Sequence, residues 1–206
     1  MSKIVLCVDN HNSHLKDTIE FLASKQCKVY TMEGLNENVL KDIINEIQQK
    51  EGRLDLLLLT ANEQLPEDNP IGKGHNDKQL LKLLDQQISG AQAVLEAALP
   101  LLEKSDFKRI GMITNSDSSN SLCQSDKNFV QHMTLAGLNM LGKIYFNRLR
   151  PDGFTFRWYC ATPESGGLSA GEYLLTNLCY DPKEPYQHSD ENRFVMRDHN
   201  LREIPW

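Results

Sequence analysis

Two histidines near the start of the chain, His11 and His14, are the first residues whose spacing could do chemistry. They lie three positions apart in a polar turn, where a pair of imidazoles could bind a metal ion or an anion. Two histidines without further ligands are a weak signal for a metal site. Histidine, asparagine and serine are also ordinary residues of turns and helix starts. A structural turn is therefore the favoured interpretation, and no metal is expected.

Three other places in the chain could contact a ligand or react. Glu33 could bind a ribose hydroxyl, although a solvated charge at a strand end is the favoured interpretation. Cys123 has no identifiable base at hand, so a reactive thiol is not supported. The segment Gly72-Lys73-Gly74 could touch a phosphate, but it lacks the full P-loop pattern and is better explained as a flexible loop over the site.

The elements that must position these residues alternate between two kinds of pattern. Short runs rich in apolar, branched or aromatic side chains predict buried strands at about 4–8, 28–32, 54–59, 110–113 and 154–160. Apolar residues at helical spacing predict helices at about 15–22, 39–47, 77–103, 127–150 and 169–179. A polar loop containing proline and glycine is expected between the third strand and the third helix, at about 62–76.

Strands and helices of these lengths predict a parallel sheet with helices on both faces and right-handed crossovers. Ligands of such sheets bind beyond the carboxyl ends of the strands, here expected at the switch point between the first and fourth structural units. The chain has 206 residues, enough for one sizeable core, and shows no internal repeat or linker. The sequence therefore predicts one α/β domain over residues 1–206.

Four segments occur in the order and spacing of one known family: Gly52-Arg53-Leu54-Asp55, Asp85-Gln86-Gln87-Ile88-Ser89-Gly90, Ala136-Gly137-Leu138-Asn139-Met140-Leu141 with the later Arg150-Pro151-Asp152-Gly153, and Glu203-Ile204-Pro205-Trp206. They resemble, in turn, the strand that normally ends in N-N-A-G, the D-V-N-x-x-G helix, the helix that carries Y-x-x-x-K, and the tail of some small members. The chain thus resembles the short-chain dehydrogenases/reductases. The resemblance implies a doubly wound, Rossmann-type three-layer sandwich.

The resemblance also implies a catalytic set, and this chain departs from it. In the family a tyrosine is the general acid/base, a lysine lowers its pKa and contacts the nicotinamide ribose, a serine orients the carbonyl, and an asparagine holds a water. These positions fall on Gln131, Leu135, Asn115 and Gln87, and a shift of one residue would move the serine position to Ser116. Glutamine and leucine side chains cannot usefully exchange a proton. We therefore expect no working catalytic set.

His132 directly follows the tyrosine position and could serve as a displaced acid/base. Adjacent residues of a helix point about 100° apart, so its side chain is expected to face away from that of Gln131. We therefore expect no catalytic role for His132.

The glycine-rich turn that binds a dinucleotide in the family is replaced as well. Three glycines there let the backbone approach the pyrophosphate at a helix N-terminus. Their positions fall on Asp9, Ser13 and Leu15, whose side chains would crowd the phosphate. The N-N-A-G positions read Leu59-Thr60-Ala61-Asn62, so Asn62 replaces the last glycine. No cofactor is expected, and NAD(P) would be expected only of an atypical oxidoreductase.

The segment after Met32 is too short for the helix and strand that the family has at this place. The next helix is expected to begin near Asn36, and the loop that supports the adenine ring in the family would be incomplete. We therefore expect a mostly parallel sheet of about six strands.

Composition narrows the environment and the partners. A net charge of -6 and a pI near 5.5 argue against nucleic acid or an anionic membrane surface as a partner. The longest apolar stretches are far too short to span a membrane. Five dispersed cysteines without C-x-x-C spacing indicate reduced thiols, so the cytoplasm is the expected location.

The long helices at 77–103 and 127–150 suggest a partner surface. In the family these two helices pair across a two-fold axis. The first carries apolar residues outside its main stripe, and these are Leu81, Leu83, Val94 and Leu99. A surplus stripe predicts a homo-oligomer formed through these helices.

The sequence favours a non-catalytic or strongly altered relative of this family. Such a protein would be a binding or regulatory protein that holds a small-molecule ligand in the cleft at the carboxyl ends of the strands. The alternative is an NAD(P)-dependent oxidoreductase with an atypical site. A third possibility is a purely structural subunit that pairs with an active relative. Fold alone does not decide between these, because function depends on the site.

Overall fold

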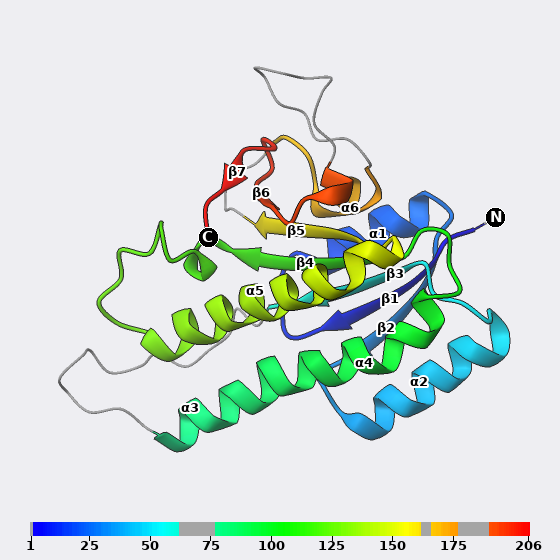
Figure 1. Ribbon diagram of the computed structural model, residues 1–206, viewed down its shortest axis with the longest axis horizontal. Coiled ribbons are helices and arrows are strands. Elements are labelled where there is room, and N and C mark those ends of the chain that lie inside the picture. Colours follow the sequence, from blue (N-terminus) through cyan, green and yellow to red (C-terminus); the bar gives the residue numbers. More distant parts are fainter. Residues whose placement is uncertain (1, 62–76, 162–165, 177–189) are drawn as a thin grey trace.

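A computed structural model describes residues 2–61, 77–161, 166–176 and 190–206. Its strands form one seven-stranded sheet in the order β2-β1-β3-β4-β5-β6-β7 (Figure 1). In chain order these strands are β1 (Ile4–Asp9), β2 (Lys28–Glu33), β3 (Leu56–Thr60), β4 (Arg109–Asn115), β5 (Thr155–Ala161), β6 (Met196–Arg197) and β7 (Glu203–Ile204). The predicted α/β class is confirmed.

The sheet is parallel from β2 to β6, and only the pair of β6 and β7 is antiparallel. The five strands placed from the sequence correspond to β1 to β5, and neither β6 nor β7 was located. Because β6 and β7 have two residues each, neither shows the alternation from which a strand is recognised in a sequence.

The described chain passes from β2 directly into α2 (Glu37–Lys50), as the short segment after Met32 predicted. β2 is therefore an edge strand, and β1 lies between β2 and β3. The strand order reverses between β1 and β3. The switch point thus lies one structural unit earlier than expected, because one strand–helix pair is missing.

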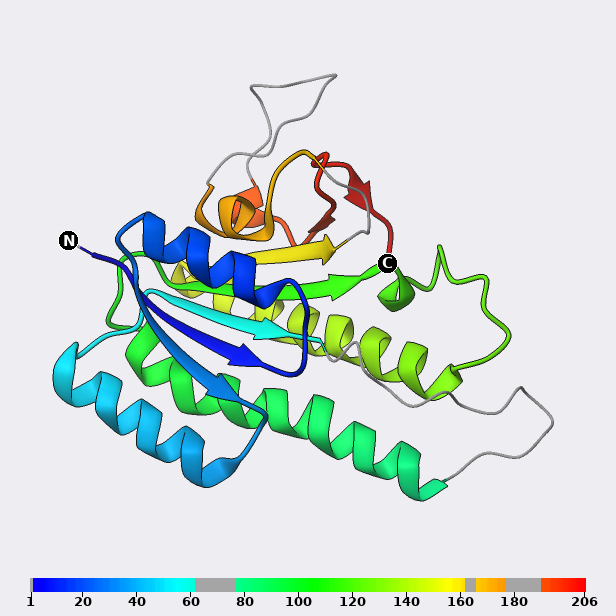
Figure 2. The same ribbon diagram turned by 180° about the vertical axis from the view of Figure 1, so that it is seen from behind.

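Helices cover both faces of the sheet and enclose two apolar cores (Figures 1 and 2). One face carries α1 (Leu15–Ser24) and α6 (Ala170–Leu175), which pack against each other. The other face carries α2, α4 (Gly90–Leu102) and α5 (Phe129–Leu149). β1 and β3 are buried on both sides, which explains their continuous apolar runs.

The helix expected at 77–103 is interrupted by one wide turn. It consists of α3 (Asp77–Leu84), a π-helical turn η1 (Asp85–Ser89) and α4. The surplus stripe predicted on it is wrong in part. Leu83 and Val94 are buried within this chain, whereas Leu81 is 65% exposed. No helix in the described part of the chain is long and apolar enough to cross a membrane.

Candidate functional site

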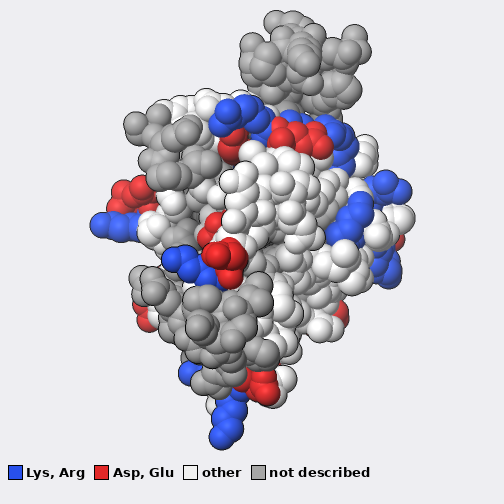
Figure 3. Space-filling model, turned by 90° about the vertical axis from the view of Figure 1, so that its left-hand side faces the viewer, with Lys and Arg blue, Asp and Glu red and all other residues white. Residues whose placement is uncertain are grey.

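The carboxyl ends of β1, β3, β4 and β5 point to the same end of the molecule, on the left in Figure 1. Figure 3 looks onto this end, where uncharged side chains form much of the described surface and most charges lie toward its rim. Ligands of open α/β sheets bind at such an edge. The turn after β1, the end of β4 and the N-terminal half of α5 build the candidate site.

The turn between β1 and α1 is filled by its own side chains. Asn12 is buried, and its amide nitrogen donates to the carbonyl of Ala61 at 3.2 Å. Its backbone N–H donates to the Asp9 carboxylate at 3.0 Å, and its side-chain oxygen accepts from the N–H of His14 at 3.0 Å. His11 takes the left-handed conformation with φ 60°, which completes the turn.

This turn does not fit a dinucleotide. A pyrophosphate is bound by free backbone N–H groups at a helix N-terminus. Here the N–H groups of Asn12 and His14 already donate to the side chains of Asp9 and Asn12, and the Asp9 carboxylate adds a negative charge that would repel a phosphate. Leu15, at the third glycine position, is buried in the core that α1 shares with the sheet.

The end of β3 also forms hydrogen bonds with the turn after β1. The Thr60 hydroxyl accepts from the N–H of Asn10 at 2.9 Å and donates to the carbonyl of Val8 at 3.2 Å. Sequence reasoning identified Asp9, Ser13 and Leu15 but missed Asn12. The available signal was an asparagine in a strand-to-helix turn, because asparagine side chains readily bond to backbone two residues away. Asn62 lies outside the described residues.

The two positions at which the resemblance implies the tyrosine–lysine pair lie on α5. Gln131 is half-buried, and Leu135 is fully buried in the core between α5 and the sheet. Leu135 therefore serves packing. A cation at this depth would need a partner to offset its desolvation.

The end of β4 is closed by a short helical turn. Asn115 is half-buried and its side chain accepts from the N–H of Asp117 at 3.0 Å, which caps the turn η2 (Ser116–Ser118). Ser116 is exposed. Asn115 thus caps this turn, and the described contacts give no reason to assign the serine position to Ser116.

Gln87 lies in the π-helical turn η1 and is 1% exposed. Its amide nitrogen donates to the Thr134 hydroxyl at 3.4 Å, and Thr134 in turn donates to the carbonyl of Val130. The Gln87 Oε1 atom has no hydrogen-bond partner among the described residues. π-turns are frequent at functional sites, and here the turn places an unpaired acceptor between the α3–α4 helix and α5.

Cys123 has a histidine beside it, contrary to the sequence-based expectation. Its Sγ lies 3.7 Å from the Nδ1 atom of His132, which also lies 2.9 Å from the carbonyl oxygen of Asp117. A carbonyl oxygen only accepts, so Nδ1 carries the proton and cannot remove one from the thiol. His132 can orient the thiol or stabilise its anion. The nine-residue separation gave no sequence signal.

A second group of polar side chains lines a pocket of about 290 Å³ beside the start of α1. His14 precedes α1 and Asp17 lies in its first turn, whereas Tyr159 and His199 come from β5 and the segment after β6. The Tyr159 hydroxyl donates to the carbonyl of Leu168 at 2.9 Å. Burial, with a smaller effect of Asp198, raises the pKa of Tyr159 to about 12, so this phenol stays protonated and is a poor base near neutral pH.

The remaining candidates from the sequence do not join these groups. Glu33 is exposed at the end of β2, in agreement with a solvated charge. Gly72-Lys73-Gly74 lies outside the described residues. Within the described part of the chain, no cluster of three potential ligands could hold a metal ion. Among the described residues, this edge of the sheet brings together amide, hydroxyl and imidazole groups.

The sequence matches no family model and no curated protein sequence. The structure is similar to a Caenorhabditis elegans protein assigned as the carbonyl reductase Sniffer, with a TM-score of 0.76, 14% identity and 100% of both chains covered. It is also similar to a Serratia marcescens short-chain dehydrogenase/reductase mutant, with a TM-score of 0.68, 14% identity and 97% of both chains covered.

A third similar structure is the RhlG/NADP active-site complex of Pseudomonas aeruginosa, with a TM-score of 0.64 and 11% identity over 79% of this chain and 73% of that one. The chain therefore has the fold of short-chain dehydrogenases/reductases. At identities this low, the structural similarity establishes the fold alone, and activity has to be argued from the site.

Proposed function

We propose that this protein is a non-catalytic binding or regulatory protein that uses a short-chain dehydrogenase/reductase scaffold without a dinucleotide. One observation carries the proposal: the β1–α1 turn is filled by the Asn12 side chain, and its N–H groups are bonded to Asp9 and Asn12. A dinucleotide would have to displace these bonds. The burial of Leu135 supports the proposal, because an apolar residue fills the core at the position expected for the lysine.

The ligand would be a small polar molecule at the carboxyl edge of the sheet. The pocket between α1 and the segment around Gly167 offers His14, Asp17 and His199. The backbone there is close-packed: a Cβ atom on Gly167 would lie 2.3 Å from the carbonyl oxygen of His199. The φ of Gly167 is +77°, so glycine is required for both reasons.

Titration with NADH and NADPH tests the absence of a cofactor. A ligand with a Kd below roughly 100 μM, added at tenfold excess over Kd, would stabilise the fold by about 1.4 kcal/mol. For a chain of this size that corresponds to a rise in Tm of about 3–5 °C. We expect no rise beyond that caused by ADP at the same concentration. A specific rise of this size would overturn the proposal.

The alternative, an atypical NAD(P)-dependent oxidoreductase, is favoured by the reductases and dehydrogenases among the similar structures. It would place NAD(P) in a changed pose and use an acid/base other than the residue at position 131. Oxidation of NADPH in the presence of a panel of aldehydes and ketones tests it. Turnover that disappears in His132→Gln but persists in the control Lys41→Gln, on the exposed face of α2, would support it.

We also propose a homo-oligomer formed through α5 and the α3–α4 helix. Three apolar side chains on α5 are more than half exposed: Met133, Met140 and Ile144. Leu81 of α3 is 65% exposed. Light scattering that shows only monomer at tens of micromolar would contradict this proposal. Ile144→Glu should shift any dimer toward monomer, whereas Lys41→Glu on α2 should not.

A further inference from the structure

A pocket of about 310 Å³ opens between α5, the turn after β4 and the C-terminal segment. Figure 1 shows the C-terminus beside the turn that follows β4. The volume is at the lower end of the range of about 300–1,000 Å³ that small-molecule sites occupy. The pocket is therefore large enough for a compact organic molecule.

This pocket faces a different direction from the cleft discussed above. Lys143 follows Gln131 by twelve residues of one α-helix, so the two side chains project about 120° apart. Asn139 and Lys143 line the pocket, whereas Leu135 faces the core. Met140 lines the pocket and is also one of the three exposed apolar side chains of α5 named above. The pocket lies apart from the β1–α1 turn that carries the proposed function, and it shares Met140 with the proposed oligomer surface.

The polar groups at the base of the pocket are engaged by the protein. The Asn139 amide nitrogen donates to the carbonyl of Ser118 at 3.0 Å, and its oxygen accepts from the indole N–H of Trp158 at 3.2 Å. The Ser118 hydroxyl donates to the carbonyl of Asn115 at 2.8 Å. These bonds fix the base of the pocket in one arrangement.

Aromatic rings form one wall. Phe194 and Trp206 stack with ring centroids 4.8 Å apart and an interplanar angle of 4°. Met140, which is 60% exposed, lines the pocket from α5. Flat aromatic rings and a thioether are suited to bind a planar apolar group.

Two polar side chains of the pocket make no hydrogen bond or ion pair with the described residues. The Lys143 ammonium lies 4.9 Å from the ring centroid of Phe146 and 5.7 Å from that of Phe194, and it is paired with no carboxylate of the described chain. Asn120 lines the same pocket, and the described residues offer its carboxamide no hydrogen bond. An ammonium group and an amide next to an aromatic wall are complementary to a carboxylate attached to a planar apolar body.

We propose that this pocket binds a small aromatic carboxylate, with the ring against Phe194 and Trp206 and the carboxylate at Lys143 and Asn120. The chain offers a direct reporter, because it contains two tryptophans and one of them, Trp206, lines the pocket. The other, Trp158, is buried. The two indole N–H signals in an NMR spectrum can be assigned with the Trp206→Phe variant.

Cinnamate and its uncharged analogue cinnamamide are the probes. We expect cinnamate to shift the indole signal of Trp206 and to bind about fivefold more tightly than cinnamamide, the difference that a solvent-exposed ion pair can supply. Lys143→Gln should remove this preference, whereas Lys41→Gln on α2 should keep it. Neither substitution removes a buried side chain, so both variants should fold.

Three results would overturn the proposal. The first is that cinnamate leaves the Trp206 signal unchanged at millimolar concentration. The second is that cinnamate and cinnamamide bind equally well. The third is that Lys143→Gln and Lys41→Gln have the same effect on cinnamate affinity.

Discussion

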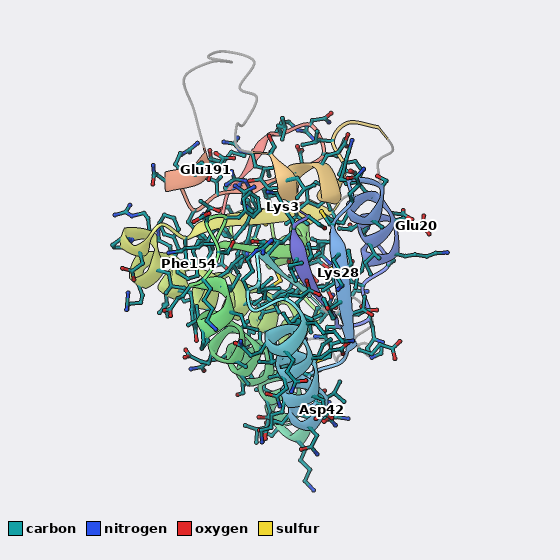
Figure 4. All side chains as sticks on the ribbon, turned by 90° about the vertical axis from the view of Figure 1, so that its right-hand side faces the viewer. Lys3, Glu20, Lys28, Asp42, Phe154 and Glu191 are labelled. Carbon is teal, nitrogen blue, oxygen red and sulfur yellow. The ribbon has the colours of Figure 1, made fainter. Side chains whose placement is uncertain are left out.

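Glu191→Gln tests the buried ionic cluster that joins the sheet to the C-terminal segment, at the end of the molecule shown in Figure 4. The Glu191 carboxylate accepts from Arg109 at 2.8 Å and from Arg157. The side chains of Arg109 and Arg157 are 1% and 0% exposed. Burial, with the neighbouring Arg157 charge, lowers the pKa of Arg109 to about 10, while Glu191 opposes this shift. The substitution would leave two adjacent buried cations without this carboxylate.

The expected loss is large but not maximal. Removing one partner of a fully buried ion pair costs about 3–5 kcal/mol. Glu191 is 28% exposed, so water screens part of its interaction, and glutamine keeps one acceptor. The arginines also donate to the carbonyls of Leu174 and Thr176. We therefore expect the free energy of unfolding to fall by about 2–3 kcal/mol.

Urea unfolding followed by circular dichroism measures this loss. With a slope of about 2–3 kcal/mol per molar urea, the midpoint should fall by about 1 M. The matched control is Glu203→Gln, because Glu203 is 48% exposed and pairs at 2.7 Å with Arg193, whose side chain is 39% exposed. The control should lose less than about 1 kcal/mol. If both variants lose the same amount, the reasoning about burial is refuted.

Three further predictions concern buried groups. Burial raises the pKa of the Cys7 thiol from 9.0 to about 12, so the stability that the neutral thiol contributes is complete below pH 9 and is lost as the pH rises toward 12. Between pH 8 and pH 10 the free energy of unfolding should therefore fall by about 1 kcal/mol more for the wild type than for Cys7→Ala. Gly142→Ala would bring a Cβ atom to 2.3 Å from the Trp158 ring and should lower the stability by about 1–3 kcal/mol, visible as a lower Tm. Gln87→Leu removes an unpaired buried acceptor, so unfolding should show equal or higher stability, and a clear loss would indicate that Oε1 is hydrogen-bonded in solution.

The part of the fold that could be predicted depends on short-range patterns. The apolar runs at the start of the chain and at Leu56–Thr60 identified buried parallel strands, and the short segment after Met32 predicted the missing strand. β6 and β7 escaped prediction because two residues carry no period. Burial of Arg109 could not be predicted either, because its partner Glu191 lies 82 residues away in sequence.

The candidate site also contains features that the sequence predicts and features that depend on the completed fold. The replacement of the family's glycines was visible at Asp9, Ser13 and Leu15, but the filling of the turn depends on the bond between Asn12 and Ala61, 49 residues apart. The pairing of Cys123 with His132 also depends on the path of the loop. Side-chain contacts between distant segments follow from the completed fold, so single-sequence patterns identify the positions and not the bonds.

The position of β2 at the edge of the sheet affects how the protein meets other chains. An edge strand exposes unpaired N–H and C=O groups, which can pair with a strand of another molecule and begin aggregation. Here the exposed Lys28 and Glu33 lie at the two ends of β2, and Thr31 between them is exposed. Charged side chains on an edge strand oppose such pairing. The charged side chains of β2 therefore oppose association between the edges of two sheets.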